Sequence, residues 1–261
     1  MTSHTSQETV RLPGGAAIPL IGFGTWQLEG AAAYDGARAA IDIGYRHIDT
    51  ATGYGNEERV GAAVRDSGID RGKIFITTKC PPERVGRELE TLDESLRALG
   101  TDFVDLWLVH WPPQGEARPE TWKVFIRALE QGKARAIGVS NYSLAQIDEL
   151  TEATGQVPSL NQIPWSPFRY DKEQAAELAD RHVVLEGYSP LKRSQLDHPV
   201  LGGIAAAHGK TPAQVILRWH VEHGFVVIPR SARRERIAEN FDIFDFELGP
   251  VELRRLDTLA S

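Results

Sequence analysis

Short apolar runs recur along the chain, and each is followed by a polar, helix-like segment. Eight runs have the length and the β-branched and aromatic content that are typical of strands. They are IGFGT (21–25), YRHID (45–49), IFITTK (74–79), FVDLWLVH (103–110), ARAIGVS (134–140), SLNQI (159–163), VVLEGY (183–188) and FVVIPR (225–230). A count of this kind can include one false strand.

The segments between these runs show helical periodicity. The leucines of RELETLDESLRALG (87–100) recur at i, i+3, i+7 and i+10, and the apolar residues of ETWKVFIRALEQG (120–132) also share one helical face. Gly132 is placed to end the second helix. Thr211, with proline next and Gln214 at the third helical position, has the form of a capping box and predicts a helix start.

Regular alternation of strands and helices predicts parallel strands joined by crossovers. Eight such units favour an α/β fold of the closed (β/α)8 TIM barrel type over an open doubly wound sheet. The stretch VRLPGGAAIPL (10–20) predicts an N-terminal β-hairpin around Gly14 and Gly15 that closes the bottom of the barrel. We therefore expect one barrel domain over residues 1–261.

Composition narrows the class of protein. The chain has 261 residues, is 41% hydrophobic and carries a net charge of −7, which argues against a nucleic-acid partner. No apolar run has membrane-spanning length, and the polar start MTSHTSQETV has no secretory h-region. The single cysteine, Cys80, suits a reducing compartment. These features predict a cytoplasmic protein without a membrane partner, and no exposed apolar helix calls for a second subunit, so we expect a monomer.

Nearly every predicted strand ends in a polar residue. In a barrel of this type the strand ends converge at one mouth, where catalytic residues lie. For Ser140, Asn141 and Ser231, solvation or capping of the next helix stays an equally open explanation. The strand-end residues are Asp49, Lys79, His110, Ser140 with Asn141, Gln162, Tyr188, and Arg230 with Ser231.

Solvation does not explain Lys79 and His110, because both follow strongly apolar segments. A buried lysine needs a partner, and Asp49 would supply one. Tyr54 follows Asp49 in the glycine-flanked loop of GYRHIDTATGYGNE (44–57). A nearby ammonium favours the phenolate and is expected to lower the pKa of this tyrosine. These four residues predict an acid that protonates a substrate oxygen, and the set contains no nucleophile with an adjacent base.

The same segments resemble the aldo-keto reductase family, in particular its bacterial diketogluconate-reductase-like members. The matching stretches are GYRHIDTATGYGNE, ITTK, LVHWP, IGVSN, NQI, YSPL and IPRSARRERIAEN, and they span residues 22–240 in the family's order. The resemblance implies a (β/α)8 barrel, NADPH as hydride donor and a small-molecule carbonyl substrate. It also implies that Tyr54 is the general acid, with Asp49, Lys79 and His110 around it.

The resemblance further implies a cofactor groove. Its members would be Ser140, Asn141 and Gln162 on the nicotinamide carboxamide, Tyr188 on the nicotinamide ring, Arg230, Ser231 and Arg236 on the 2′-phosphate, and Glu239 and Asn240 on the adenine. A solvated charged face is the alternative for RSARRER (230–236). The chain departs from the family at Arg230, where lysine is usual, and at Pro164, where glutamate is common. The first change keeps the charge, so the preference for NADPH should survive.

Three aromatic residues are candidates for the pocket wall. Trp26 and Trp111 each follow a strand end, which favours the pocket over core packing, whereas Phe23 fits either location equally. The chain ends at Ser261 without the longer tail of many relatives, which predicts an open pocket and broad specificity.

Two other functions compete with carbonyl reduction. A non-catalytic NADP(H)-binding sensor would keep the same residues, and turnover of a generic aldehyde would separate the two. A metal-dependent hydrolase would need several His and Asp ligands at the mouth. Only His110 and Asp49 are available there, with Lys79 between them, so we expect no metal site.

Overall fold

A computed structural model describes residues 8–192 and 194–260 of the chain. Most of the polar start on which the expectation of no secretory signal rests, residues 1–7, lies outside the described residues. Within them, no helix combines the length and apolar character needed to cross a membrane.

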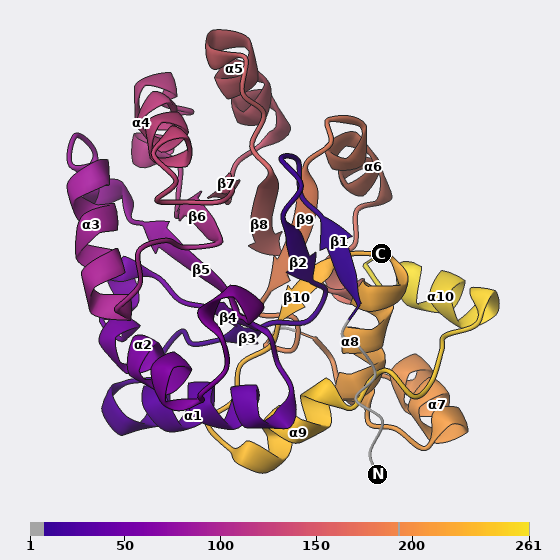
Figure 1. The fold of residues 1–261 in the computed structure, drawn as a ribbon. Coiled ribbons are helices and arrows are strands. Elements are labelled where there is room, and N and C mark those ends of the chain that lie inside the picture. The colour runs from indigo at the N-terminus through magenta and orange to yellow at the C-terminus, as the bar shows by residue number, and fades with distance from the viewer. Residues whose placement is uncertain (1–7, 193, 261) are drawn as a thin grey trace.

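Eight parallel strands form the barrel (Figure 1). Each predicted run overlaps one of them, with β5 and β8 each extending one residue beyond the predicted run, and they follow in unbroken order from β3 to β10 around the sheet. The first and last strands meet through a parallel bridge between Ile21 and Val227, and the Gly24 amide donates to the Pro229 carbonyl at 3.0 Å. The strands are β3 (Phe23–Gly24), β4 (His47–Asp49), β5 (Phe75–Cys80), β6 (Leu106–Val109), β7 (Ile137–Ser140), β8 (Leu160–Pro164), β9 (Val184–Tyr188) and β10 (Val226–Ile228).

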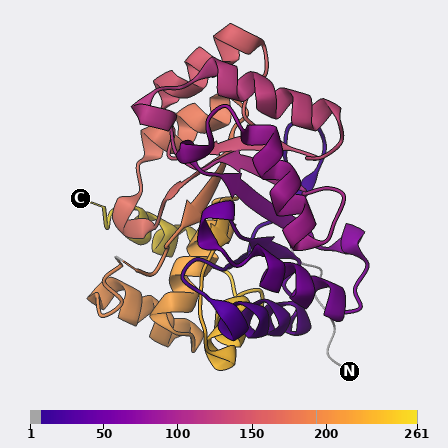
Figure 2. The ribbon, with the colours of Figure 1, turned by 90° about the vertical axis from the view of Figure 1, so that its left-hand side faces the viewer.

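The helices lie outside the strands on every side that Figures 1 and 2 show. The predicted capping box is present: Thr211 and Gln214 bond reciprocally at the start of α8. Gly132 has a positive φ of 70° directly after the last turn of α4, as its expected role requires. The helices are α1 (Gly30–Ile43), α2 (Glu57–Asp66), α3 (Glu88–Leu99), α4 (Pro119–Glu130), α5 (Leu144–Thr154), α6 (Lys172–Asp180), α7 (Pro199–His208), α8 (Pro212–Glu222), α9 (Arg234–Phe241) and α10 (Pro250–Asp257).

Apolar side chains between the strands and the helices form the outer part of the core. Trp107 of β6 stacks on Phe125 of α4 with ring centroids 3.6 Å apart, and both are fully buried. Leu92, Leu96 and Leu99 of α3 are also buried, as their helical spacing predicts. This packing holds the strand ends in fixed positions, which a site built from several strands requires.

The N-terminal hairpin is present at the opposite end of the barrel from the strand carboxyl ends. Its strands β1 (Thr9–Arg11) and β2 (Ala17–Pro19) pair antiparallel, with Val10 opposite Ile18. Gly14 and Gly15 supply the positive φ angles of the turn, 94° and 95°. We call this end of the barrel the base and the other end the mouth.

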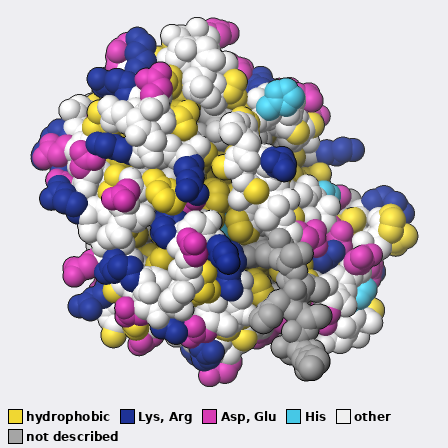
Figure 3. Space-filling model, in the orientation of Figure 1, with side chains coloured by type: hydrophobic (Ala, Val, Ile, Leu, Met, Phe, Trp, Pro, Cys, Tyr) yellow, Lys and Arg dark blue, Asp and Glu magenta, His cyan; other side chains and the backbone are white. Residues whose placement is uncertain are grey.

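A cleft of about 730 Å³ lies at the base, between the hairpin and the amino ends of the strands. Thr9, Ala17, Arg46 and Phe75 are among the residues that line it. On the face of the molecule that Figure 3 shows, acidic and basic side chains are interspersed, without a large area of one sign. The larger cleft, at the mouth, contains the predicted chemistry.

Candidate active site

A pocket of about 1100 Å³ opens at the mouth of the barrel. It collects residues from the carboxyl ends of seven strands and from α9, so the predicted convergence of strand ends is observed. Most of the sequence-predicted site residues line it: Trp26, Asp49, Tyr54, His110, Trp111, Ser140, Asn141, Gln162, Tyr188, Arg230, Ser231, Arg236, Glu239 and Asn240. Two predicted residues, Lys79 and Phe23, do not line it.

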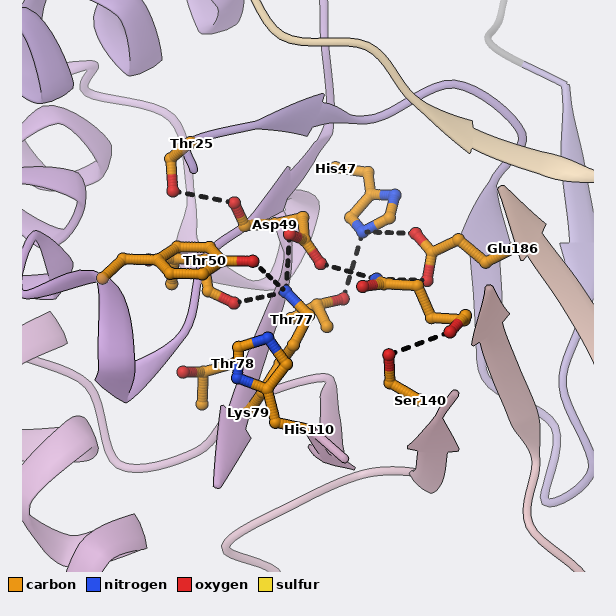
Figure 4. Close-up of polar contacts among 12 residues, drawn as sticks. Thr25, His47, Asp49, Thr50, Thr77, Thr78, Lys79, His110, Ser140 and Glu186 are labelled. Atoms are coloured by element: carbon orange, nitrogen blue, oxygen red, sulfur yellow. Dashed lines mark hydrogen bonds and ion pairs between the residues drawn. The ribbon is translucent and has the colours of Figure 1, made fainter. Parts of the chain in front are cut away.

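Lys79 lies beneath the pocket floor and is completely buried. Its Nζ donates to Asp49 Oδ1 at 2.6 Å and to the Thr50 carbonyl at 2.7 Å, and it lies 3.5 Å from the Tyr54 hydroxyl (Figure 4). Burial opposes the lysine charge, but Asp49, Tyr54 and Glu186 together outweigh it and raise the pKa of Lys79. A permanent ammonium group therefore stands next to the phenol.

Tyr54 ends a short 3-10 helix, η1 (Thr52–Tyr54), and Gly55 turns the chain away with a φ of 65°. This loop aims the hydroxyl at Lys79. Burial raises the pKa of Tyr54 above its usual value, and Lys79 lowers it by less. The net direction is opposite to the lowering expected from the sequence, because that expectation considered the ammonium group but not the depth of the phenol in the pocket.

His110 lies directly after β6, with its ring centroid 5.7 Å from that of Tyr54. Burial, together with repulsion by Lys79, lowers the pKa of His110 to about 3. The imidazole is therefore neutral at physiological pH and can offer one ring N–H to a substrate oxygen.

A polar network continues below Asp49, and the sequence analysis did not assign it. Gln162 Nε2 donates to Asp49 Oδ2 at 2.9 Å and to Glu186 Oε2 at 3.0 Å. Glu186 Oε1 lies 3.8 Å from His47 Nε2, and all these side chains are buried (Figure 4). Burial and the nearby negative charge of Asp49 raise the pKa of Glu186 to about 8.

The two-residue period of a β-strand is a sequence signal that could have identified His47 and Glu186. Side chains two positions apart on a strand share one face, so a residue two positions before a strand-end site residue also points into the barrel. His47 precedes Asp49 by two positions, and Glu186 precedes Tyr188 by two positions. A polar residue at such a position within an apolar run is the signal.

One wall of the pocket presents amide and hydroxyl groups. Ser140 Oγ donates to the Gln162 carbonyl at 2.8 Å, and Asn141 Nδ2 donates to Ser140 Oγ at 3.0 Å. The Tyr188 hydroxyl donates to Asn141 Oδ1 at 2.9 Å and so fixes both side chains. Asn141 adopts a positive φ of 64°, a conformation that asparagine tolerates better than most residues.

The outer rim of the pocket is basic. Arg230 and Arg236 are exposed, and Arg236 makes no ion pair with any described residue. Arg230 donates to the Gln27 side chain at 2.8 Å, across the mouth from β10 to the loop after β3. Ser231 Oγ accepts from the Arg233 amide at 3.1 Å just before α9 begins. Positive charge and a helix N-terminus suit an anionic group.

The three aromatic candidates fall in two places. Trp26 and Trp111 line the pocket and are 40% and 48% exposed, and Lys192 Nζ lies 4.5 Å above the Trp26 ring. Phe23 is 1% exposed and packs edge-on against Tyr45. Phe23 therefore belongs to the core between the barrel and α1, not to the pocket wall.

No group of three or more potential His, Cys, Asp or Glu metal ligands occurs within residues 8–192 and 194–260. Burial raises the pKa of Cys80, so its thiol stays protonated.

The model of the Aldo/keto reductase family matches residues 20–261. An aldo-keto reductase of Mycolicibacterium smegmatis is 42% identical over 97% of this chain and 93% of its own. A glyoxal reductase of Bacillus subtilis is 41% identical, with the same two coverages. The crystal structure of an aldo/keto reductase from Brucella melitensis superposes with a TM-score of 0.91 at 43% identity, covering 97% of this chain and all of that one.

The chain belongs to the aldo-keto reductase family. It is therefore an oxidoreductase that acts on carbonyl and alcohol groups, in a family that uses nicotinamide cofactors. The family resemblance and the (β/α)8 barrel expected from the sequence are both confirmed.

Proposed function

We propose that this protein reduces aldehydes and ketones to alcohols with NADPH, and that Tyr54 is the general acid. The observation that carries the proposal is the position of Lys79 Nζ, which is buried, paired with Asp49 and 3.5 Å from the Tyr54 hydroxyl. An ammonium group in this position stabilises a phenolate. It favours Tyr54 in the proton-donating role.

The raised pKa of Tyr54 suits that role. The phenol stays protonated at neutral pH and releases its proton only to a strong base, such as the alkoxide that develops during carbonyl reduction. Lys79 then stabilises the phenolate, and neutral His110 donates a hydrogen bond that orients the carbonyl oxygen. NADPH, when bound, supplies the hydride that reaches the carbonyl carbon, and the two transfers together give the alcohol.

The residues of the pocket fit a nicotinamide cofactor. A carboxamide needs both donors and acceptors, which Ser140, Asn141 and Gln162 present on one wall. The Tyr188 ring, fixed by its bond to Asn141, offers a flat face for the nicotinamide ring. Glu239 and Asn240 of α9 lie at the far end of the same pocket, where the adenine would bind.

The basic rim supports NADPH over NADH. The two cofactors differ by the 2′-phosphate, and Arg230, Arg236 and the hydroxyl of Ser231 gather near the start of α9. Arginine can bind a phosphate through two parallel hydrogen bonds. This side of the pocket would hold the 2′-phosphate.

The substrate end of the pocket favours small aldehydes and ketones. Trp26 and Trp111 present exposed apolar rings to the pocket that Tyr54 also lines. The B. subtilis relative is named a glyoxal reductase, so dicarbonyls are the first substrates to test. We further propose that residues 1–261 work as one catalytic unit, as a monomer in the cytoplasm.

The test is turnover. Purified protein is mixed with NADPH and glyoxal, methylglyoxal or a nitrobenzaldehyde, and the absorbance of the reduced nicotinamide is followed. We expect steady loss with wild type and a loss of about 10²–10⁴-fold in kcat for Tyr54→Phe, which removes the acid but not the ring.

The matched control is Tyr45→Phe. It removes the hydroxyl of a buried tyrosine that, among the described residues, donates to the Ile237 carbonyl, outside the pocket. Its kcat should stay at the wild-type value. Wild-type protein that binds NADPH but turns over none of the carbonyl compounds would favour the sensor alternative, and an active Tyr54→Phe variant would exclude the acid assignment.

A further inference from the structure

Glu186 is a buried carboxyl group beneath the floor of the pocket, and the proposed reaction does not use it. We infer that Glu186 is a positioning residue that acts together with Asp49. The two carboxyl groups fix the side-chain amide of Gln162 so that its carbonyl oxygen faces the pocket and accepts an N–H of the nicotinamide carboxamide. This inference rests on the proposed function, because it concerns how the cofactor is recognised.

Both hydrogens of the Gln162 side-chain amide are used in hydrogen bonds. A primary amide nitrogen carries two hydrogens and can donate two bonds. Gln162 Nε2 lies 2.9 Å from Asp49 Oδ2 and 3.0 Å from Glu186 Oε2. Both hydrogens are therefore taken by carboxyl oxygens from two different strands, β4 and β9.

Asp49 excludes the reversed orientation of the Gln162 side-chain amide, in which the oxygen and the nitrogen exchange places. Burial raises the pKa of Asp49, but Lys79 Nζ, 2.6 Å from Asp49 Oδ1, opposes this shift and pairs with the acceptor-only carboxylate form. A flipped Gln162 would place its oxygen against Asp49 Oδ2, and two acceptor oxygens cannot form a hydrogen bond, whatever the protonation state of Glu186. Glu186 Oε2 can accept from Gln162 whether or not the carboxyl group holds a proton. Two acceptors define the amide plane, whereas one leaves it free to turn about that bond.

The side-chain oxygen of Gln162 lies on the other side of the amide from these two hydrogen bonds. Gln162 Oε1 accepts no hydrogen bond within the described residues, although the residue is only 3% exposed and lines the pocket. A ligand that brings an N–H donor to this oxygen gains a hydrogen bond, whereas a ligand without a donor leaves the oxygen unpaired. Of the groups that a pyridine cofactor can carry, a carboxamide has this N–H, and a methyl ketone does not.

Glu186 is itself held firmly. It lies on β9 between β8 and β10 and is 0% exposed. The titratable groups that face it are His47 and Asp49 from β4 and Lys79 from β5. This surrounding fixes the position of the acceptor and explains how a residue outside the pocket lining can act on the ligand through Gln162.

The experiment compares two cofactors on folded protein. NADPH and its 3-acetylpyridine analogue, in which a methyl ketone replaces the carboxamide, are titrated by quenching of tryptophan fluorescence. Wild type should bind NADPH more tightly, by a factor of about 10. In Glu186→Met, which keeps the length but loses the acceptor, the ratio of the two dissociation constants should fall about five-fold. Glu186→Gln keeps an acceptor oxygen and should restore the ratio.

The matched control is Glu57→Met. Glu57 is also a buried carboxyl near the mouth, but it accepts from Thr78 and Ser95 and does not touch Gln162. This variant should lose stability and keep the cofactor ratio. A ratio unchanged in Glu186→Met, or lowered equally in Glu57→Met, would overturn the positioning role while the proposed function stands. Wild type that binds neither cofactor would overturn the proposed function itself.

If Glu186→Met does not fold, hydrogen exchange of the Gln162 side-chain amide in the wild type tests whether that amide is fixed. The side-chain amide signals of Gln162, identified by their absence in Gln162→Met, are followed by NMR in deuterated water. Because both hydrogens are bonded and buried, they should exchange far more slowly than those of the exposed Gln131 side chain. Equally fast exchange would mean that the amide is not fixed.

Discussion

Two lysine–aspartate pairs of the same length occupy different regions of the molecule. At the mouth, Lys79 lies 2.6 Å from Asp49, and the two side chains are 0% and 2% exposed. Near the base, Lys133 also lies 2.6 Å from Asp93, but their side chains are 31% and 47% exposed. Water screens the second pair and not the first. The distance between the charges is therefore a poor guide to what each pair does.

The buried carboxyl groups of the two regions differ in the same way. At the base, Asp105 accepts from the Ile76 amide at 3.0 Å and pairs with Arg71 at 2.8 Å and Arg135 at 3.3 Å. At the mouth, Glu186 Oε1 and His47 Nδ1 have no hydrogen-bond partner among the described residues. There, Lys79 is paired with Asp49 and also interacts with Glu186.

The comparison indicates two uses of buried charge. The base satisfies its polar groups and contributes to stability, whereas the mouth keeps groups under-satisfied, which costs stability and leaves them available for chemistry. Four substitutions test this division.

Lys79→Met should lower kcat by about 10³-fold, because no cation then stabilises the Tyr54 phenolate. It should also destabilise the fold by about 3–5 kcal/mol, since Asp49 is left buried without its partner. Lys133→Met should change kcat very little and the free energy of unfolding by about 0–1 kcal/mol. Steady-state kinetics and urea unfolding measure both quantities. Equal effects of the two variants would remove the distinction between the regions.

Arg236→Met should raise the dissociation constant of NADPH about 10-fold and leave that of NADH unchanged, because only NADPH carries the 2′-phosphate. Arg234→Met is the control on the same helix, since Arg234 does not line the pocket. Arg135→Met is the control at the base. Fluorescence titration with each cofactor gives the values. A similar loss for NADH would show that the arginine does not read the phosphate.

Asp105→Asn should destabilise the fold by about 1–3 kcal/mol, because it weakens two charged hydrogen bonds in a buried position. The kcat measured on folded protein at 25 °C should stay within about two-fold of wild type, since Asp105 lies at the opposite end of the strands. Thermal or urea unfolding, paired with the aldehyde assay, tests both parts. A large fall in kcat without loss of stability would contradict a purely structural base.

Glu186→Gln should change the pH dependence of stability. The pKa of Glu186 is about 8 in the folded protein and near 4.5 when unfolded, so the folded state keeps a proton that the unfolded state releases between these values. Wild-type stability therefore falls as pH rises through this window. Glutamine has no proton to lose. The free energy of unfolding of the variant, relative to that of wild type, should therefore rise by at most about 1.4 kcal/mol per pH unit from pH 5 to 8. Parallel curves would place the pKa of Glu186 near its ordinary value.

Much of the fold and site could be predicted from the sequence, because each strand ends close to its polar residue. The run that ends in Lys79 and the run that ends in His110 indicate both the register and the mouth. Phe23 shows where local pattern is insufficient. Its side chain packs towards Gly36 of α1, outside the barrel, and only the pairing of β3 with β4 decides which face it takes.

Electrostatic quantities were less predictable than positions. The direction of the Tyr54 pKa depends on how deeply the loop after β4 is buried, which depends on neighbours far away in the chain. Glu186 and Gln162 are brought to Asp49 by strands more than a hundred residues later. A sequence motif identifies the groups that react but not the charge that surrounds them.

The parallel bridge between Ile21 and Val227, where the two ends of the barrel sheet meet, has a consequence for folding during synthesis of the chain. On the ribosome, the segment with Tyr54, Lys79 and His110 emerges long before Gln162 and Glu186. The segment with Ile21 and β3 can pair with β10 only after β10 has been synthesised. Contacts between such distant segments form late in folding. A nascent chain can therefore carry every reacting group and remain inert, because its environment is completed only when nearly the whole polypeptide has been translated.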